Sequence, residues 1–131
     1  MSEFSWPVRV YYEDTDAGGV VYYANYLKFM ERARTEWLRA HGVEQDRLTA
    51  EHGTLFVIVG CNVRYHKPAR FNEQLAVTVA LGEHGRSRFA VEQTVRRGDE
   101  MLVSATVTAA CIDAATFRPR PIPIPLPRGM P

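Results

Sequence analysis

The spacing of apolar residues changes along the chain, from alternation typical of strands to the three- and four-residue spacing of a helix and back. Residues 6–12 alternate and are rich in β-branched and aromatic side chains, which predicts a first strand. An acidic, glycine-containing segment interrupts this pattern at 13–19. From about 23 to 41 the apolar residues recur at helical spacing and form one stripe, consisting of Tyr26, Phe29, Met30, Ala33 and Trp37. The pattern therefore predicts a strand, a tight loop and a long amphipathic helix that Gly42 ends.

The second half of the chain has the patterns of β-strands. A short helix is predicted over 45–51, and four strand-like runs follow at 55–65, 75–81, 88–96 and 101–112. The connections at 82–87 and 97–100 are short and contain glycine, which is typical of hairpins between antiparallel neighbours. One long helix followed by antiparallel strands predicts an α+β domain whose sheet curves around the helix.

The C-terminal segment is rich in proline. Six of the eight prolines fall in the last fifteen residues. Because proline lacks a backbone N–H and has a fixed φ, this segment is predicted to be neither a helix nor a central strand. We expect one domain over 1–116 and an extended tail over 117–131, lying on the surface or on a neighbouring subunit.

Composition and charge narrow the classes of function. Sixteen Lys and Arg and fifteen Asp and Glu leave a net charge of +1, so no global field would recruit nucleic acid or a membrane. No segment has the pattern of a signal peptide or a membrane span, which predicts a soluble cytoplasmic protein. The four histidines and the two cysteines lack ligand spacing, so no metal site is expected. Cys61 and Cys111 are predicted to be buried, reduced thiols.

The segment 12–23, YEDTDAGGVVYY, carries the densest chemistry and lies where the first strand gives way to the helix. A helix start presents unpaired N–H groups that can bind an oxyanion, and glycines let a carbonyl approach the backbone. Asp16 stands a few residues before these donors. Hydrolysis of a thioester needs little beyond a carboxylate and such donors, because the leaving thiol has a pKa of about 8.5 and requires no general acid. Asp16 fits both direct attack and general-base activation of water, although an acidic turn that caps a helix has the same composition.

A longer set of positions resembles the 4-hydroxybenzoyl-CoA thioesterase family. It comprises 10–22, Tyr26, 31–34, Tyr65 and 68–70, and the closest branch resembles the YbgC-type, Tol-Pal-associated acyl-CoA thioesterases. The resemblance implies the hot-dog fold, in which a curved antiparallel sheet wraps one long central helix. It also implies hydrolysis of short-chain or aromatic acyl-CoA without a cofactor, since coenzyme A is part of the substrate, at sites built between paired subunits.

The resemblance also assigns roles to residues. Asp16 stands in the place of the catalytic carboxylate, and Tyr23 stands where a backbone N–H holds the thioester oxygen. The YbgC-type branch usually has His at that position, whereas the aromatic-acyl branch has Tyr, so the acyl preference stays open. The acyl end of the substrate is expected to contact Gly19, Val20, Val21, Tyr22 and Tyr26.

The phosphates of coenzyme A need cations from later in the chain, because residues 1–52 carry six basic and nine acidic side chains. Arg86 and Arg88 are the first candidates, since they lie at a predicted hairpin and match a basic stretch that the family uses near the phosphates. Lys67 and Arg70 are the second candidates.

The open edge of a curved sheet is normally paired or covered, so a homodimer or a dimer of dimers is expected. Proteins of lipid synthesis or of the cell envelope are further expected partners. Two other functions stay open: an acyl-thioester hydratase or dehydratase, and a non-catalytic protein that binds acyl-CoA. The first usually pairs a His with an acid across the site, and 12–23 contains no His.

Overall fold

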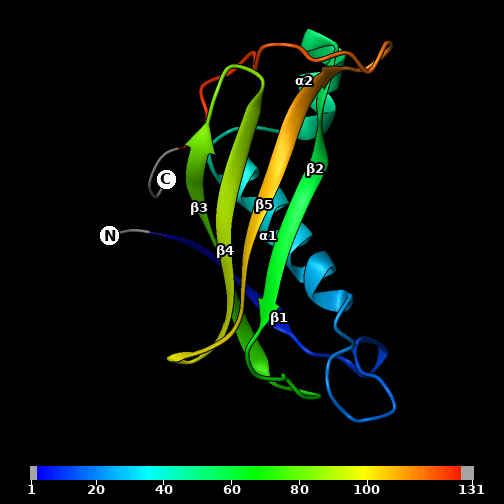
Figure 1. The fold of residues 1–131 in the computed structure, drawn as a ribbon, viewed down its shortest axis with the longest axis vertical. Coiled ribbons are helices and arrows are strands. Elements are labelled where there is room, and N and C mark those ends of the chain that lie inside the picture. The colour runs from blue at the N-terminus through cyan, green and yellow to red at the C-terminus, as the bar shows by residue number, and fades with distance from the viewer. Residues whose placement is uncertain (1–2, 128–131) are drawn as a thin grey trace.

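A computed structural model describes residues 3–127, and within them the chain folds into two helices and one five-stranded sheet. All neighbouring strands are antiparallel, in the order β1-β3-β4-β5-β2. The strands are β1 (Phe4–Arg9), β2 (Thr54–Tyr65), β3 (Gln74–His84), β4 (Arg88–Arg97) and β5 (Glu100–Asp113), and the helices are α1 (Asn25–Ala40) and α2 (Gln45–His52). Figure 1 shows α1 crossing one face of the sheet. The predicted α+β architecture is confirmed.

The core forms between the apolar stripe of α1 and the inner face of the sheet. Phe29, Met30 and Ala33 have no exposed surface, and Trp37 is 2% exposed. Alternate residues of β3 and β4 complete this core, as the period-two pattern predicts. Because a single helix is only marginally stable in water, this burial is what holds α1 in its position.

The first strand and the helix differ from their predicted bounds. The predicted strand over 6–12 is instead β1, which ends at Arg9, and a 3-10 turn follows at Tyr12–Asp14. The chain turns away there because the Asp14 carboxylate accepts the Tyr11 N–H at 2.8 Å. The helix begins two residues later than predicted, since the N–H of Asn25 bonds the carbonyl of Tyr22 at 2.8 Å and closes a turn before the helix.

The described part of the proline-rich tail lies on its own subunit. The N–H of Arg120 bonds the carbonyl of Cys111 at 3.0 Å, and the N–H of Ile122 bonds the carbonyl of Arg86 at 2.8 Å. Ile122 and Leu126 pack against the core. The tail thereby covers the end of the β3–β4 hairpin. Residues 128–131 of the predicted tail lie outside the described residues, and the boundary after residue 116 stays a prediction.

Strand β2 forms one edge of the sheet and leaves apolar surface uncovered. Ile58 and Val59 are 49% and 48% exposed, and the register shifts between Ile58 and Gly60. Cys61 is exposed, so the prediction of a buried thiol is wrong at this position, because an edge strand has a neighbour on one side only. Cys111 is buried, and both thiols are free.

The packing of α1 predicts a large difference between two adjacent helix positions. Phe29→Ala removes a fully buried ring and should lower the free energy of unfolding by about 3–5 kcal/mol. Lys28→Ala, on the exposed face, should change it by less than about 0.5 kcal/mol. Urea denaturation at one fixed protein concentration measures both, and equal midpoints for the two variants would contradict this account of the core.

Candidate active site

Asp16 opens a narrow turn between β1 and α1. Its N–H bonds the carbonyl of Val20 at 2.9 Å, and its carbonyl accepts the N–H of Gly19 at 3.0 Å. Thr15 and Val21 pair on either side of this turn. Gly19 has a φ of +80°, which favours glycine over residues with a Cβ. The sequence therefore folds here into a small closed loop with Asp16 on its exposed side.

The Asp16 carboxylate is held at one oxygen. Its Oδ1 accepts the Gly18 N–H at 2.8 Å, and the structure describes no second hydrogen-bond donor to it within residues 3–127. A Cβ at position 18 would lie 3.2 Å from the same oxygen, so glycine keeps the carboxylate uncrowded. One oxygen of an exposed, oriented carboxylate is thus available to a ligand.

Asp14, two residues earlier, has a structural role. It is buried, and its carboxylate accepts the Tyr11 N–H at 2.8 Å and the Asn25 side-chain amide at 3.3 Å. Its carbonyl accepts the N–H of Tyr22 at 2.9 Å. Asp14 therefore connects the loop to the first residue of α1. Its carboxylate is buried and hydrogen-bonded within the protein, whereas that of Asp16 is exposed and available to a ligand.

The start of α1 leaves a backbone donor unpaired. The N–H of Tyr23 has no hydrogen-bond acceptor within the described part of the chain. Its carbonyl accepts the hydroxyl of Tyr65 at 3.2 Å, from the far end of β2. Unpaired N–H groups at a helix start carry partial positive charge, so this position can bind a carbonyl oxygen that gains negative charge.

A hollow of about 250 Å³ lies beside Tyr23, with aromatic walls from Tyr26 and Tyr65. The ring of Tyr65 lies 6.0 Å from that of Tyr23 and 5.7 Å from that of Tyr26. Burial raises the pKa of Tyr65 and of Tyr26, so both hydroxyls stay protonated near neutral pH. The Tyr26 hydroxyl accepts the N–H of Ala69 at 3.0 Å, which fixes the β2–β3 loop against the helix.

The residues predicted to bind the acyl end take different places around this hollow. Val21 and Tyr26 line it, while Gly19 and Val20 belong to the Asp16 turn. Tyr22 is exposed, with its ring 5.0 Å from that of Tyr23. The structure therefore brings these residues to one end of the sheet, around the start of α1.

Of the predicted cations, Lys67 and Arg70 lie at this same end. Lys67 lines the hollow, and Arg70 pairs with Val20 through a backbone bridge. The ammonium of Lys67 lies 2.8 Å from the Glu100 carboxylate, which Arg97 also contacts at 2.6 Å. A phosphate at Lys67 would therefore compete with an ion pair that already exists.

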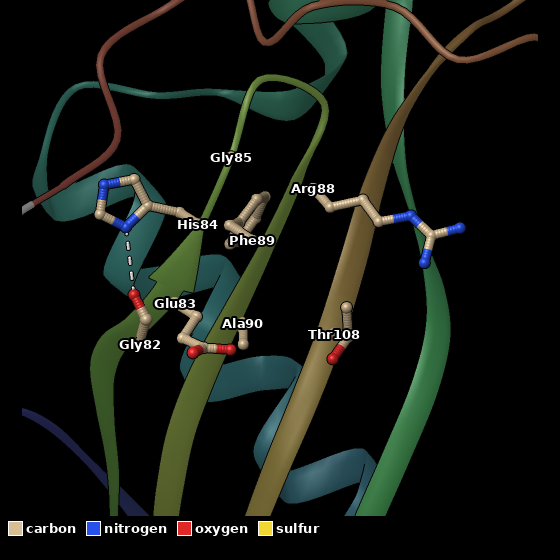
Figure 2. A pocket seen from close by; sticks show the side chains of 8 residues that line it. All are labelled: Gly82, Glu83, His84, Gly85, Arg88, Phe89, Ala90 and Thr108. Atoms are coloured by element: carbon tan, nitrogen blue, oxygen red, sulfur yellow. Dashed lines mark hydrogen bonds between the residues drawn. The ribbon is translucent and has the colours of Figure 1, made fainter.

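Arg86 and Arg88 lie at the opposite end. β3 runs eleven residues from the Asp16 end to the hairpin, which at about 3.3 Å per residue separates the two ends by roughly 30 Å. An open hollow of about 730 Å³ lies there, lined by the hairpin and by Thr108 of β5. Figure 2 shows Arg88 extending from β4 toward β5 and away from Glu83. One chain alone thus keeps Asp16 and these arginines apart.

The contacts of three residues that shape the site were not predicted from the sequence. The buried carboxylate of Asp14 belongs to the same segment as Asp16, and no local signal distinguishes the two. The contact from Tyr65 to Tyr23 spans 42 positions, and the pairing of Glu100 with Lys67 spans 33. Within residues 3–127 no group of three His, Cys, Asp or Glu side chains is placed to hold a metal ion.

Known proteins match the chain over almost its whole length. The sequence profile of the Thioesterase-like superfamily matches residues 10–127. The chain belongs to this superfamily. It is 45% identical over 121 residues to the acyl-CoA thioester hydrolase YbgC of Escherichia coli O157:H7, spanning 92% of this chain and 90% of that protein. It is 44% identical over 120 residues to the acyl-CoA thioesterase YbgC of Haemophilus influenzae, spanning 92% and 88%.

A solved structure of a probable thioesterase from Bartonella henselae is similar throughout, with a TM-score of 0.89 at 34% identity over 93% of this chain and 100% of that one. The predicted hot-dog fold and the predicted family of acyl-CoA thioester hydrolases are confirmed by these matches. Neither helix within residues 3–127 is long and apolar enough to cross a membrane.

The ion pairs beside the hollow predict a dependence of stability on pH. Hydrogen bonds from Lys67 and Arg97 lower the pKa of Glu100 to about 2. Burial alone would raise the pKa of Glu73, but the N–H of Arg70 and the guanidinium of Arg97 lower it. Both pKa values lie below the unfolded value of about 4.3, so the stabilisation is complete above that pH and is lost as the pH falls toward about 2.

Arg97→Gln should therefore flatten the decline of the urea midpoint between about pH 5 and pH 2.5. Arg47→Gln removes an exposed pair with Glu51 and should leave the slope of that decline unchanged. Parallel profiles for wild type and Arg97→Gln would contradict the assignment.

Proposed function

We propose that this chain hydrolyses the thioester of short-chain or aromatic acyl-CoA, with Asp16 as the attacking carboxylate or as the base that activates water. The observation that carries the proposal is the exposed Asp16 carboxylate in a glycine turn, tied through Asp14 to a helix start with an unpaired N–H at Tyr23. The identity to proteins named acyl-CoA thioester hydrolases supports it.

Each part of this arrangement has one task in the reaction. The Tyr23 N–H and the positive end of α1 stabilise the oxygen that becomes negative as the carbonyl carbon is attacked. Tyr65 holds the Tyr23 carbonyl and so orients that peptide. Asp16 either forms an acyl anhydride, which water then cleaves, or takes a proton from the attacking water. The thiolate of coenzyme A leaves without a general acid because its own pKa is low for a leaving group.

The nucleotide end of the substrate is held by a second copy of the chain in this proposal. The exposed apolar edge at Ile58 and Val59 suits pairing of β2 with its copy, related by a two-fold axis. Antiparallel pairing lays the first residues of one β2 beside the last residues of the other. The β3–β4 hairpin lies at the end of the sheet where β2 begins (Figure 1). Arg86 and Arg88 of the partner subunit then come to the Asp16 end.

The role of Asp16 predicts a specific loss of turnover. Asp16→Asn is nearly isosteric but neither attacks nor accepts a proton, so kcat should fall by about 10²-fold or more with an unchanged melting temperature. Glu13→Gln, an exposed neighbour, should keep wild-type kcat. Thiol release from butyryl-CoA and benzoyl-CoA measures both. Equal turnover by wild type and Asp16→Asn, or hydration of crotonyl-CoA by an enzyme that releases no thiol from these substrates, would refute the proposal.

The shared site predicts complementation between two defective chains. Arg86→Ala with Arg88→Ala should raise KM by about 5- to 30-fold, because each exposed phosphate contact contributes about 0.5–1 kcal/mol. Subunit exchange between this variant and Asp16→Asn should create mixed dimers with one fully intact site, and turnover with wild-type KM should reappear. Asp16→Asn mixed with the triple variant should regain nothing. Absence of a low-KM component in the first mixture, or a monomer mass by light scattering, would contradict the two-subunit site.

A further inference from the structure

Another hollow, of about 170 Å³ and partly open at the β2 edge, lies between the C-terminal half of α1 and the inner face of the sheet. Its walls are largely apolar and aromatic, with Trp37 on α1, Phe56 and Ile58 on β2, and Phe89 on β4. Arg34 of α1 also lines it. The volume is below the roughly 300–1,000 Å³ of pockets for drug-sized ligands, so the hollow fits a short chain or a small ring.

Arg34 is fixed in this hollow by a buried amide. Its guanidinium donates to Oε1 of Gln93 at 3.0 Å, and Gln93 is 1% exposed. Nε2 of Gln93 donates in turn to the carbonyl of Met30 at 3.1 Å. Burial lowers the pKa of Arg34, but a guanidinium stays charged at neutral pH. The core of the protein thus holds a cation at the wall of an apolar pocket.

No carboxylate lies within 4 Å of this guanidinium in the described part of the chain, although Glu31 acts on it electrostatically from a longer distance. None of the ion pairs within residues 3–127 includes Arg34. Glu31 also lines the hollow, but it is exposed and accepts the hydroxyl of Thr35 at 2.6 Å. A partly desolvated charge is costly when it is unpaired, and the fork of a guanidinium matches a carboxylate.

The hollow adjoins the proposed catalytic site only across a subunit boundary. Phe56 and Ile58 belong to the first half of β2, whereas Tyr65, beside Tyr23, ends the same strand. The antiparallel pairing of β2 edges lays these two halves against each other. In the proposed dimer, an acyl group whose carbonyl is bound at Tyr23 of one subunit would therefore extend toward this hollow of the other.

We propose that this hollow receives the distal part of the acyl group and that Arg34 binds a carboxylate at its end. The preferred substrates are then coenzyme A thioesters of short dicarboxylic acids. This inference rests on the proposed function, and it names the substrate class that the two-subunit site selects. The apolar walls take the methylene groups, and the paired charge replaces the water that Arg34 loses on burial.

Matched substrates of equal chain length test the inference. Succinyl-, glutaryl- and adipoyl-CoA are compared with butyryl-, pentanoyl- and hexanoyl-CoA in thiol release. Wild type should favour at least one dicarboxylic member of a pair by about tenfold in kcat/KM, the size of one charge-assisted hydrogen bond. Arg34→Gln should bring that ratio to about one, and Arg34→Lys should restore part of it. Arg32→Gln, which changes an exposed arginine of the same helix, should leave the ratio unchanged.

Three results would overturn the inference. Wild type could hydrolyse both members of every pair equally, which leaves the proposed function intact and removes Arg34 from substrate selection. Arg34→Gln could lower both members alike or dissociate the oligomer, which would assign Arg34 to the fold or to a partner's carboxylate. Wild type could release thiol from benzoyl-CoA but from none of the six substrates, which would overturn this inference alone, whereas failure with benzoyl-CoA as well would refute the proposed function too.

Discussion

The burial of the aromatic stripe of α1 against the curved sheet is the contact on which the other features depend. Phe29, Met30 and Trp37 are nearly free of solvent contact, so the helix has one position and one rotation about its axis. Because the helix cannot shift, its first turn always faces the loop after β1. The same packing turns Arg34 toward the sheet, where the buried amide of Gln93 holds its guanidinium.

The start of α1 is held by three contacts, and two of them join segments more than 40 positions apart in the sequence. Asp14 connects it to the loop, Tyr65 connects it to the end of β2, and Tyr26 connects it to the β2–β3 loop. Preorganised donors of this kind lower a barrier because they need no reorganisation as charge develops. The exposed Asp16 lies next to these contacts, in the glycine-containing turn between β1 and α1.

In the proposed dimer, pairing at the edge of the sheet compensates for the distance between Asp16 and the hairpin arginines within one chain. Asp16 and the hairpin arginines lie at opposite ends of strands that run the length of the sheet. A two-fold axis at β2 would bring opposite ends together without any change in the subunit. Pairing would also cover Ile58 and Val59, whose exposure is otherwise unfavourable in water.

The sequence by itself determined the elements and their chemistry. The spacing of apolar residues predicted every strand and both helices, since burial of one face imposes a period of two on a strand and of about 3.6 on a helix. The segment around Asp16 indicated the thioesterase family. The sequence did not predict the boundaries at Arg9 and Asn25, because the Asp14 carboxylate accepts the Tyr11 N–H and the Asn25 N–H closes a turn on the Tyr22 carbonyl. Only the tertiary structure separated buried Asp14 from exposed Asp16, set Lys67 against Glu100 and put Arg86 far from the loop. These features depend on how distant segments pack against each other. The spacing of residues within one segment carries no information about its distance from another segment in the folded protein.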